Sequence, residues 1–96
     1  MLGRDEILQR LQERQKEMAT RFSVRRIGLF GSYLRGNESE KSDIDLIVEL
    51  SEPTFDHYMD LKFYLEALFE RPVDLVLSDT IKPRLKPLIQ KEATYA

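Results

Sequence analysis

The chain has 96 residues, no cysteine, and a net charge of −2 from 15 basic and 17 acidic residues. The length predicts a single domain over residues 1–96, and the absence of cysteine excludes disulfides and cysteine-ligated zinc and fits a reducing cytoplasm. The balanced charge argues against sequence-independent nucleic-acid binding, and we expect neither a signal peptide nor a membrane-spanning segment.

Two long segments have the periodicity of helices. Apolar residues at positions 7, 8, 11 and 18 recur at helical spacing, which predicts an amphipathic helix from Asp5 to about Thr20. The segment PTFDHYMDLKFYLEALFERP, residues 53–72, predicts a second helix with an apolar stripe, ended by Pro72.

Three apolar segments predict strands, at Val24–Phe30, Asp43–Leu50 and Val73–Leu77. The second and third flank the long helix and form a β-α-β unit, so we expect them to be parallel neighbours in an α/β fold. About a dozen residues link the first strand to the second, and this link does not fix the direction of that pair.

The C-terminal segment predicts one more helix. Asp79 or Thr80 would cap it, and it would run through IKPRLKPLIQKEA. Pro83 suits its first turn, whereas Pro87 is expected to break or restart it.

Aspartates interrupt the second and third predicted strands. Asp43 and Asp45 alternate onto one face of the second strand, and Asp74 is the second residue of the third. Carboxylates on adjacent apolar strands repel one another and lose solvation, which raises their pKa values, and a divalent cation reverses that balance. Ligands that are all oxygen suit Mg²⁺ or Mn²⁺ together with substrate phosphates. The alternative is a solvent-facing edge strand, which Glu49 on the same face would also fit.

A Gly-Ser pair follows the first predicted strand. Gly31 lets the backbone approach an anion closely, and Ser32 offers a hydroxyl donor, although it could instead cap a helix. A helical turn opening there would direct free N–H groups at a phosphate. Arg35 or Lys41 could add a positive charge, and a surface ion pair is the alternative for Arg35.

Gly31-Ser32, ten residues and then Asp43-Ile44-Asp45 resemble the GSx10DxD signature of the DNA polymerase β-like nucleotidyltransferase superfamily. Over nearly its whole length the chain is most similar to minimal nucleotidyltransferases, the MntA-type antitoxins of HEPN/MNT toxin–antitoxin pairs. Asp74 in RPVDLVL fits the third carboxylate of that family.

The resemblance implies a small mixed sheet of three strands flanked by helices. It implies that Asp43, Asp45 and Asp74 bind one or two Mg²⁺, that Asp74 also acts as base, and that Gly31 and Ser32 bind the triphosphate. It further implies transfer of AMP from ATP to a tyrosine of a cognate HEPN toxin in a hetero-oligomer. The chain has no room for an acceptor domain, so we expect the acceptor to come from outside. The alternatives are an antitoxin that neutralises its partner by binding alone and a nucleotidyltransferase with a small-molecule acceptor.

Overall fold

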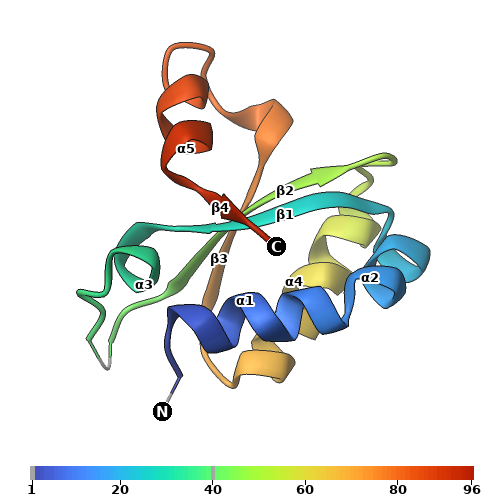
Figure 1. The fold of residues 1–96 in the computed structure, drawn as a ribbon. Helices are drawn as coiled ribbons and strands as arrows, with labels where there is room; N and C mark the ends of the chain where they lie inside the picture. Colours follow the sequence, from blue (N-terminus) through green and yellow to red (C-terminus); the bar gives the residue numbers. More distant parts are fainter. Residues whose placement is uncertain (1, 40) are drawn as a thin grey trace.

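The computed structural model describes residues 2–39 and 41–96, whose strands form one mixed sheet in the order β3-β2-β1-β4 (Figure 1). The strands are β1 (Val24–Phe30), β2 (Ile44–Leu50), β3 (Val73–Leu77) and β4 (Thr94–Tyr95). β2 and β3 are parallel, as predicted, whereas β1 runs antiparallel to both β2 and β4. The α/β class with a mixed sheet is confirmed, but the expected count of three strands is wrong because of β4.

β4 is a two-residue strand that completes the sheet beside β1. Its residues pair with Gly28 and Leu29 of β1. A Cβ atom on Gly28 would lie 3.0 Å from the Tyr95 ring, so the missing side chain leaves room for this ring. The Arg26 guanidinium lies over the same ring, 4.0 Å from its centroid, in a cation–π contact. Two residues are too few to show the alternation by which strands are recognised in a sequence.

Of the three predicted helices, only the long one over residues 53–72 has bounds close to those observed. They are α1 (Arg4–Glu13), α2 (Gln15–Phe22), α3 (Gly31–Arg35), α4 (Phe55–Phe69) and α5 (Lys86–Glu92), with a 3₁₀ turn η1 (Ser78–Thr80). The single helix expected from Asp5 to Thr20 is wrong, because the chain leaves helical geometry at Arg14 and starts again as α2. Neither proline nor glycine stands at this break, so no local residue type predicted it.

The C-terminal segment also departs from its prediction. Asp79 and Thr80 lie in η1, and Pro83 lies in a turn that precedes α5 rather than in its first turn. Pro87 does mark a restart, since it occupies the first turn of α5, where its missing N–H costs no helical hydrogen bond.

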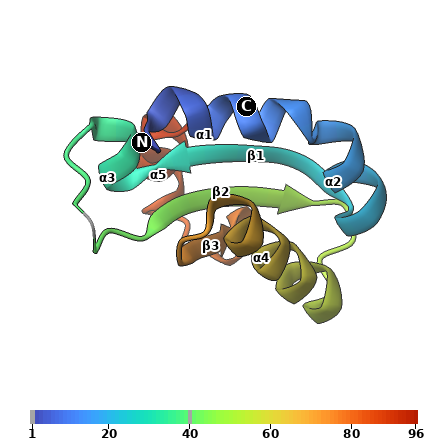
Figure 2. The ribbon, with the colours of Figure 1, turned by 90° about the horizontal axis from the view of Figure 1, so that it is seen from below.

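The apolar core lies on one face of the sheet, between the strands and the helices α1, α2 and α4 (Figure 2). Ile44, Leu46, Val48 and Leu50 of β2 all point into this core. Strand geometry therefore directs Asp45, Ile47 and Glu49 to the opposite face, on the side where α5 lies (Figure 1). Within residues 2–39 and 41–96, no helix has the length and apolar character needed to span a bilayer.

Candidate functional site

The register of the sheet brings together residues from three predicted strands at one end. Phe30 at the end of β1 pairs with Asp45 of β2, and Asp45 pairs with Asp74 of β3. Gly31 follows Phe30 directly and starts α3. The Gly-Ser turn and the two strand aspartates therefore lie side by side at the ends of three strands. Gly31 and Asp74 are 43 positions apart in the sequence.

Gly31 is required by its position against the Asp45 carboxylate. Its φ angle is +76°, a conformation that side chains other than glycine rarely adopt. A Cβ atom added there would collide with the Asp45 carboxyl group. Glycine thus lets a carboxylate approach the backbone at the start of α3.

Three aspartates interact electrostatically at this end of the sheet. Partial burial raises the pKa of Asp45 to about 6, with further contributions from the charges of Asp74 and Asp43 and a hydrogen bond with Asp74. The nearby Arg35 charge opposes this rise. The predicted mutual repulsion of the carboxylates is therefore present at Asp45.

Glu49 shares a face with Asp45 but has a different partner. Its carboxylate lies 3.8 Å from the Arg25 guanidinium of β1, so it forms an ordinary surface ion pair. The two acidic residues on this face of β2 therefore differ. Glu49 is paired with a basic neighbour, whereas Asp45 lies close to other carboxylates.

Arg35, whose charge acts on Asp45, is tied to the C-terminal part of the chain. Arg35, in the last turn of α3, forms an ion pair with Glu92 of α5 at 2.5 Å. Lys41, the other basic candidate, is exposed in the linker before β2. The ion-pair alternative for Arg35 is therefore realised here. Sequence reasoning missed Glu92, because it lies 57 residues from Arg35 and no local pattern relates the two positions.

Ser32 lies inside α3 and does not cap it. The N-cap position belongs to Phe30, and no side chain of the described residues accepts a hydrogen bond there. The alternative of a Ser32 cap is wrong, and the backbone N–H groups of this first turn have no side-chain acceptor in residues 2–39 and 41–96. Free N–H groups at a helix start favour an anion.

The donor set fits Mg²⁺ in its chemistry. Asp43, Asp45 and Asp74 supply only oxygen, and the pKa of Asp45 is raised by partial burial and by the like charges of its neighbours, which a cation would offset. In the described part of the chain, no three His, Cys, Asp or Glu side chains are gathered as a preformed metal group. Mg²⁺ normally uses one or two protein carboxylates and completes its octahedron with phosphates and water. The three-aspartate ligand set stays a prediction.

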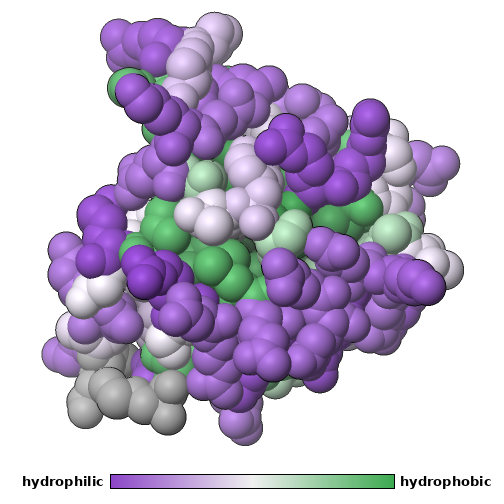
Figure 3. Space-filling model, in the orientation of Figure 1, coloured by the Kyte–Doolittle hydropathy of each residue, from purple (hydrophilic) through white to green (hydrophobic). Residues whose placement is uncertain are grey.

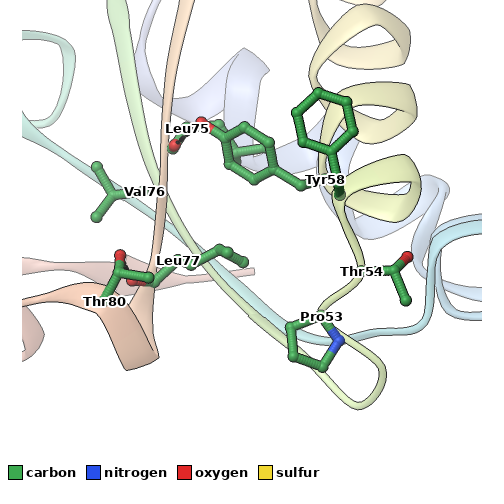
Figure 4. Close-up of a pocket in the computed structure, with 8 residues that line it drawn as sticks. Pro53, Thr54, Tyr58, Leu75, Val76, Leu77 and Thr80 are labelled. Carbon is green, nitrogen blue, oxygen red and sulfur yellow. Dashed lines mark hydrogen bonds between the residues drawn. The ribbon is translucent and has the colours of Figure 1, made fainter.

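A separate hollow of about 390 Å³ lies between the start of α4 and the outer edge of β3 (Figure 4). Its lining is mostly apolar and includes no carboxylate among the described residues. Tyr58 closes one side and donates a hydrogen bond to the Leu75 carbonyl oxygen at 2.5 Å. This hollow lacks the charged groups of the aspartate end and does not belong to the candidate site.

Residues 5–96 match the family model of the nucleotidyltransferase domain. The chain belongs to this family. It is therefore a nucleotidyltransferase, and the aspartate end of its sheet is the candidate active site.

Two relatives place this nucleotidyltransferase in the minimal, MntA-type branch that the sequence resembles. Protein adenylyltransferase MntA of Thermococcus cleftensis is 41% identical over 96 residues, which cover 99% of this chain and 97% of the relative. A solved structure of a presumed minimal nucleotidyltransferase has a TM-score of 0.75 at 34% identity, covering 91% of this chain and 93% of its own.

A third similarity concerns the fold alone. A Shewanella oneidensis complex of a tri-AMPylated HEPN toxin with an MNT antitoxin contains a chain with a TM-score of 0.63 at 20% identity. This similarity covers 92% of the present chain and 70% of the matched one.

Proposed function

We propose that this nucleotidyltransferase is an antitoxin that transfers AMP from ATP to a tyrosine hydroxyl of a HEPN toxin. The observation that carries the proposal is that Gly31, directly after β1, lies against Asp45 of β2, which pairs with Asp74 of β3. The similarity to a protein adenylyltransferase over 99% of the chain supports protein as the acceptor class. In this proposal residues 1–96 act as one domain in the cytoplasm, where ATP is available.

The start of α3 binds the triphosphate. Gly31 allows close approach of the backbone, and the first-turn N–H groups together with the Ser32 hydroxyl donate hydrogen bonds to phosphate oxygens. Arg35 lies close enough to lower the pKa of Asp45 and adds positive charge beside the phosphates. Asp43, Asp45 and Asp74 would hold one or two Mg²⁺, which, when bound, offset the negative charge of the reacting phosphate.

Asp74 serves as the base. Its exposed position leaves its carboxylate accessible to an incoming hydroxyl, and removing that proton by a positioned base is worth about 10²- to 10⁴-fold in rate. The tyrosine oxygen then forms a bond to the α-phosphorus, the bond from that phosphorus to the β-phosphate oxygen breaks, and pyrophosphate leaves. The remaining catalysis comes from holding the reactants in line.

The acceptor comes from a second protein. The HEPN toxin and this chain would form a hetero-oligomer in which the tyrosine reaches the aspartate end. A solved relative of the same fold is a complex of an AMPylated HEPN toxin with an MNT antitoxin, which supports this arrangement.

A transfer assay tests the proposal. The chain and Mg²⁺ are incubated with the proposed HEPN partner and with ATP labelled either on the α-phosphorus or on the γ-phosphorus. We expect label on a HEPN tyrosine with the α-label and none with the γ-label, because AMP and not phosphate is transferred.

The variant Asp43→Asn/Asp45→Asn should transfer no label, whereas the control Asp60→Asn, at an exposed position of α4, should transfer it normally. If Asp43→Asn/Asp45→Asn neutralises the toxin as well as the native chain does without transferring label, the chain neutralises by binding. Label on a small molecule rather than on protein would place the acceptor in another class.

A further inference from the structure

The segment 81–92 projects from the sheet as a basic and partly apolar surface. Four of the 15 basic residues of the chain lie between positions 81 and 91, and none of its 17 acidic residues does. Leu88 is 64% exposed and Leu85 is 41% exposed. We call the surface formed by Lys82, Arg84, Leu85, Leu88 and Lys91 the α5 surface; Figure 3 shows apolar patches among hydrophilic atoms over the projecting part.

The part of the chain that the structure describes leaves this surface uncovered. α5 contributes no buried residue, so the core does not account for its apolar side chains. Two ion pairs attach it to the rest of the described chain: Arg35–Glu92 at 2.5 Å and Lys86–Asp79 at 4.0 Å. Leu85 and Leu88 are three residues apart and the Ile89 N–H bonds to the Leu85 carbonyl, so both leucines lie on one helical turn. Neighbouring exposed leucines at the start of a helix are typical of a docking surface.

α5 is joined at its C-terminal end to the helix that begins at the candidate active site. The segment from β3 to β4 starts at one edge of the sheet and ends at the other, on the side opposite α1, α2 and α4 (Figure 1). The Arg35–Glu92 pair joins the end of α5 to the end of α3, whose first residue, Gly31, lies against Asp45. The ion pair therefore fixes the C-terminal end of α5, and with it the α5 surface, to the helix that begins at the aspartate end.

We infer that the α5 surface docks an acidic, partly apolar surface of the protein that carries the acceptor hydroxyl. This inference rests on the proposed function, because it assigns the partner-binding element of the same site. Charge complementarity sets the sign of the partner: the α5 surface is basic in a chain whose net charge is −2. The leucines favour a protein over a nucleic acid, since the segment 81–92 has no aromatic side chain on which a base could stack.

The inference is tested by calorimetry, which measures the Kd of the HEPN protein for the full chain and for matched variants. Leu88→Ser is compared with Phe63→Ser, since Phe63 is 59% exposed but belongs to α4 on the other side of the sheet. Arg84→Glu is compared with Lys16→Glu, an exposed position of α2. We expect Leu88→Ser and Arg84→Glu to raise Kd by about tenfold or more, as truncation of a buried interface anchor does. Phe63→Ser and Lys16→Glu should leave Kd within about twofold of native. The native Kd should also rise with salt, because charge pairing is screened.

Three results distinguish the possible failures. Equal Kd values for Leu88→Ser and Phe63→Ser overturn the inference, even if the native chain transfers AMP. Loss of binding in Leu88→Ser together with no AMP transfer by the native chain supports the docking surface and refutes the proposed function. The third result concerns lipid. If the native chain sediments with phosphatidylserine vesicles, and Leu88→Ser loses this sedimentation without a change in Kd for the HEPN protein, the surface binds lipid. That result would also overturn the inference.

Discussion

Replacing Asp45 by asparagine is predicted to stabilise the metal-free protein at neutral pH. The folded chain raises the pKa of Asp45 from an ordinary 3.8 to about 6, through partial burial and the charges of Asp74 and Asp43. Between these two pH values the folded state binds the Asp45 proton more tightly than the unfolded state does. The free energy of unfolding therefore falls as pH rises from about 4 through about 6, and the ionised carboxylate destabilises the fold above that range.

The size of the effect follows from the pKa. A rise from 3.8 to about 6 corresponds to about 3 kcal/mol if it is retained in full. Because Asp45 is only half-buried and solvent screens its neighbours, we expect about 1 to 1.5 kcal/mol. In a domain of this size that is a Tm increase of about 4 to 12 °C for Asp45→Asn.

Thermal unfolding in a chelating buffer near pH 4 and near pH 7.5 measures this difference. Asp45→Asn should match the native chain near pH 4 and exceed it near pH 7.5, whereas Asp60→Asn on exposed α4 should show no such dependence on pH. Added Mg²⁺ should stabilise the native chain near pH 7.5 and stabilise Asp45→Asn less. The reasoning is refuted if Asp45→Asn is no more stable than the native chain near pH 7.5.

Two further predictions concern the turn at the site and the separate hollow beside β3. Gly31→Ala and Gly36→Ala both place a side chain at a positive φ, of +76° and +78° respectively. The added Cβ at Gly31 would collide with the Asp45 carboxyl group, whereas nothing lies within 4 Å of the added Cβ at Gly36. Both should lose about 1 kcal/mol or more of stability in urea unfolding, but only Gly31→Ala should weaken nucleotide binding; equal binding losses would contradict the account. Tyr58→Phe removes the hydrogen bond to the Leu75 carbonyl oxygen, 2.5 Å long, and should cost about 1 kcal/mol in the same assay. Its nucleotide affinity should equal that of the native chain, and a lowered affinity would show that the edge of β3 contributes to the site.

The strands of the site were predictable because their signals are local. Val24–Phe30 and Val73–Leu77 are short apolar runs with clear ends, and the structure gives both with the predicted bounds. The parallel pairing of β2 and β3 followed from the long helix between them. Asp45 and Asp74 could be placed on neighbouring strands for that reason, although their direct pairing in register was not predictable.

Features that depend on contacts between distant segments were not predictable. The antiparallel direction of β1 against β2 depends on a short linker that allows either geometry. β4 exists because the Tyr95 ring fits beside Gly28, a contact across 67 positions. The Arg35–Glu92 pair depends on where α5 lies after the turns of the C-terminal segment, which two prolines make irregular.

Calorimetric binding of a non-hydrolysable ATP analogue, with Mg²⁺ and with a chelator, tests the central claim that the aspartate end is a metal–triphosphate site. Mg²⁺ should strengthen binding by the native chain, because it supplies the positive charge that Asp43, Asp45 and Asp74 otherwise oppose. Asp43→Asn/Asp45→Asn should lose that dependence. Nucleotide affinity that is the same with Mg²⁺ and with the chelator would contradict the account.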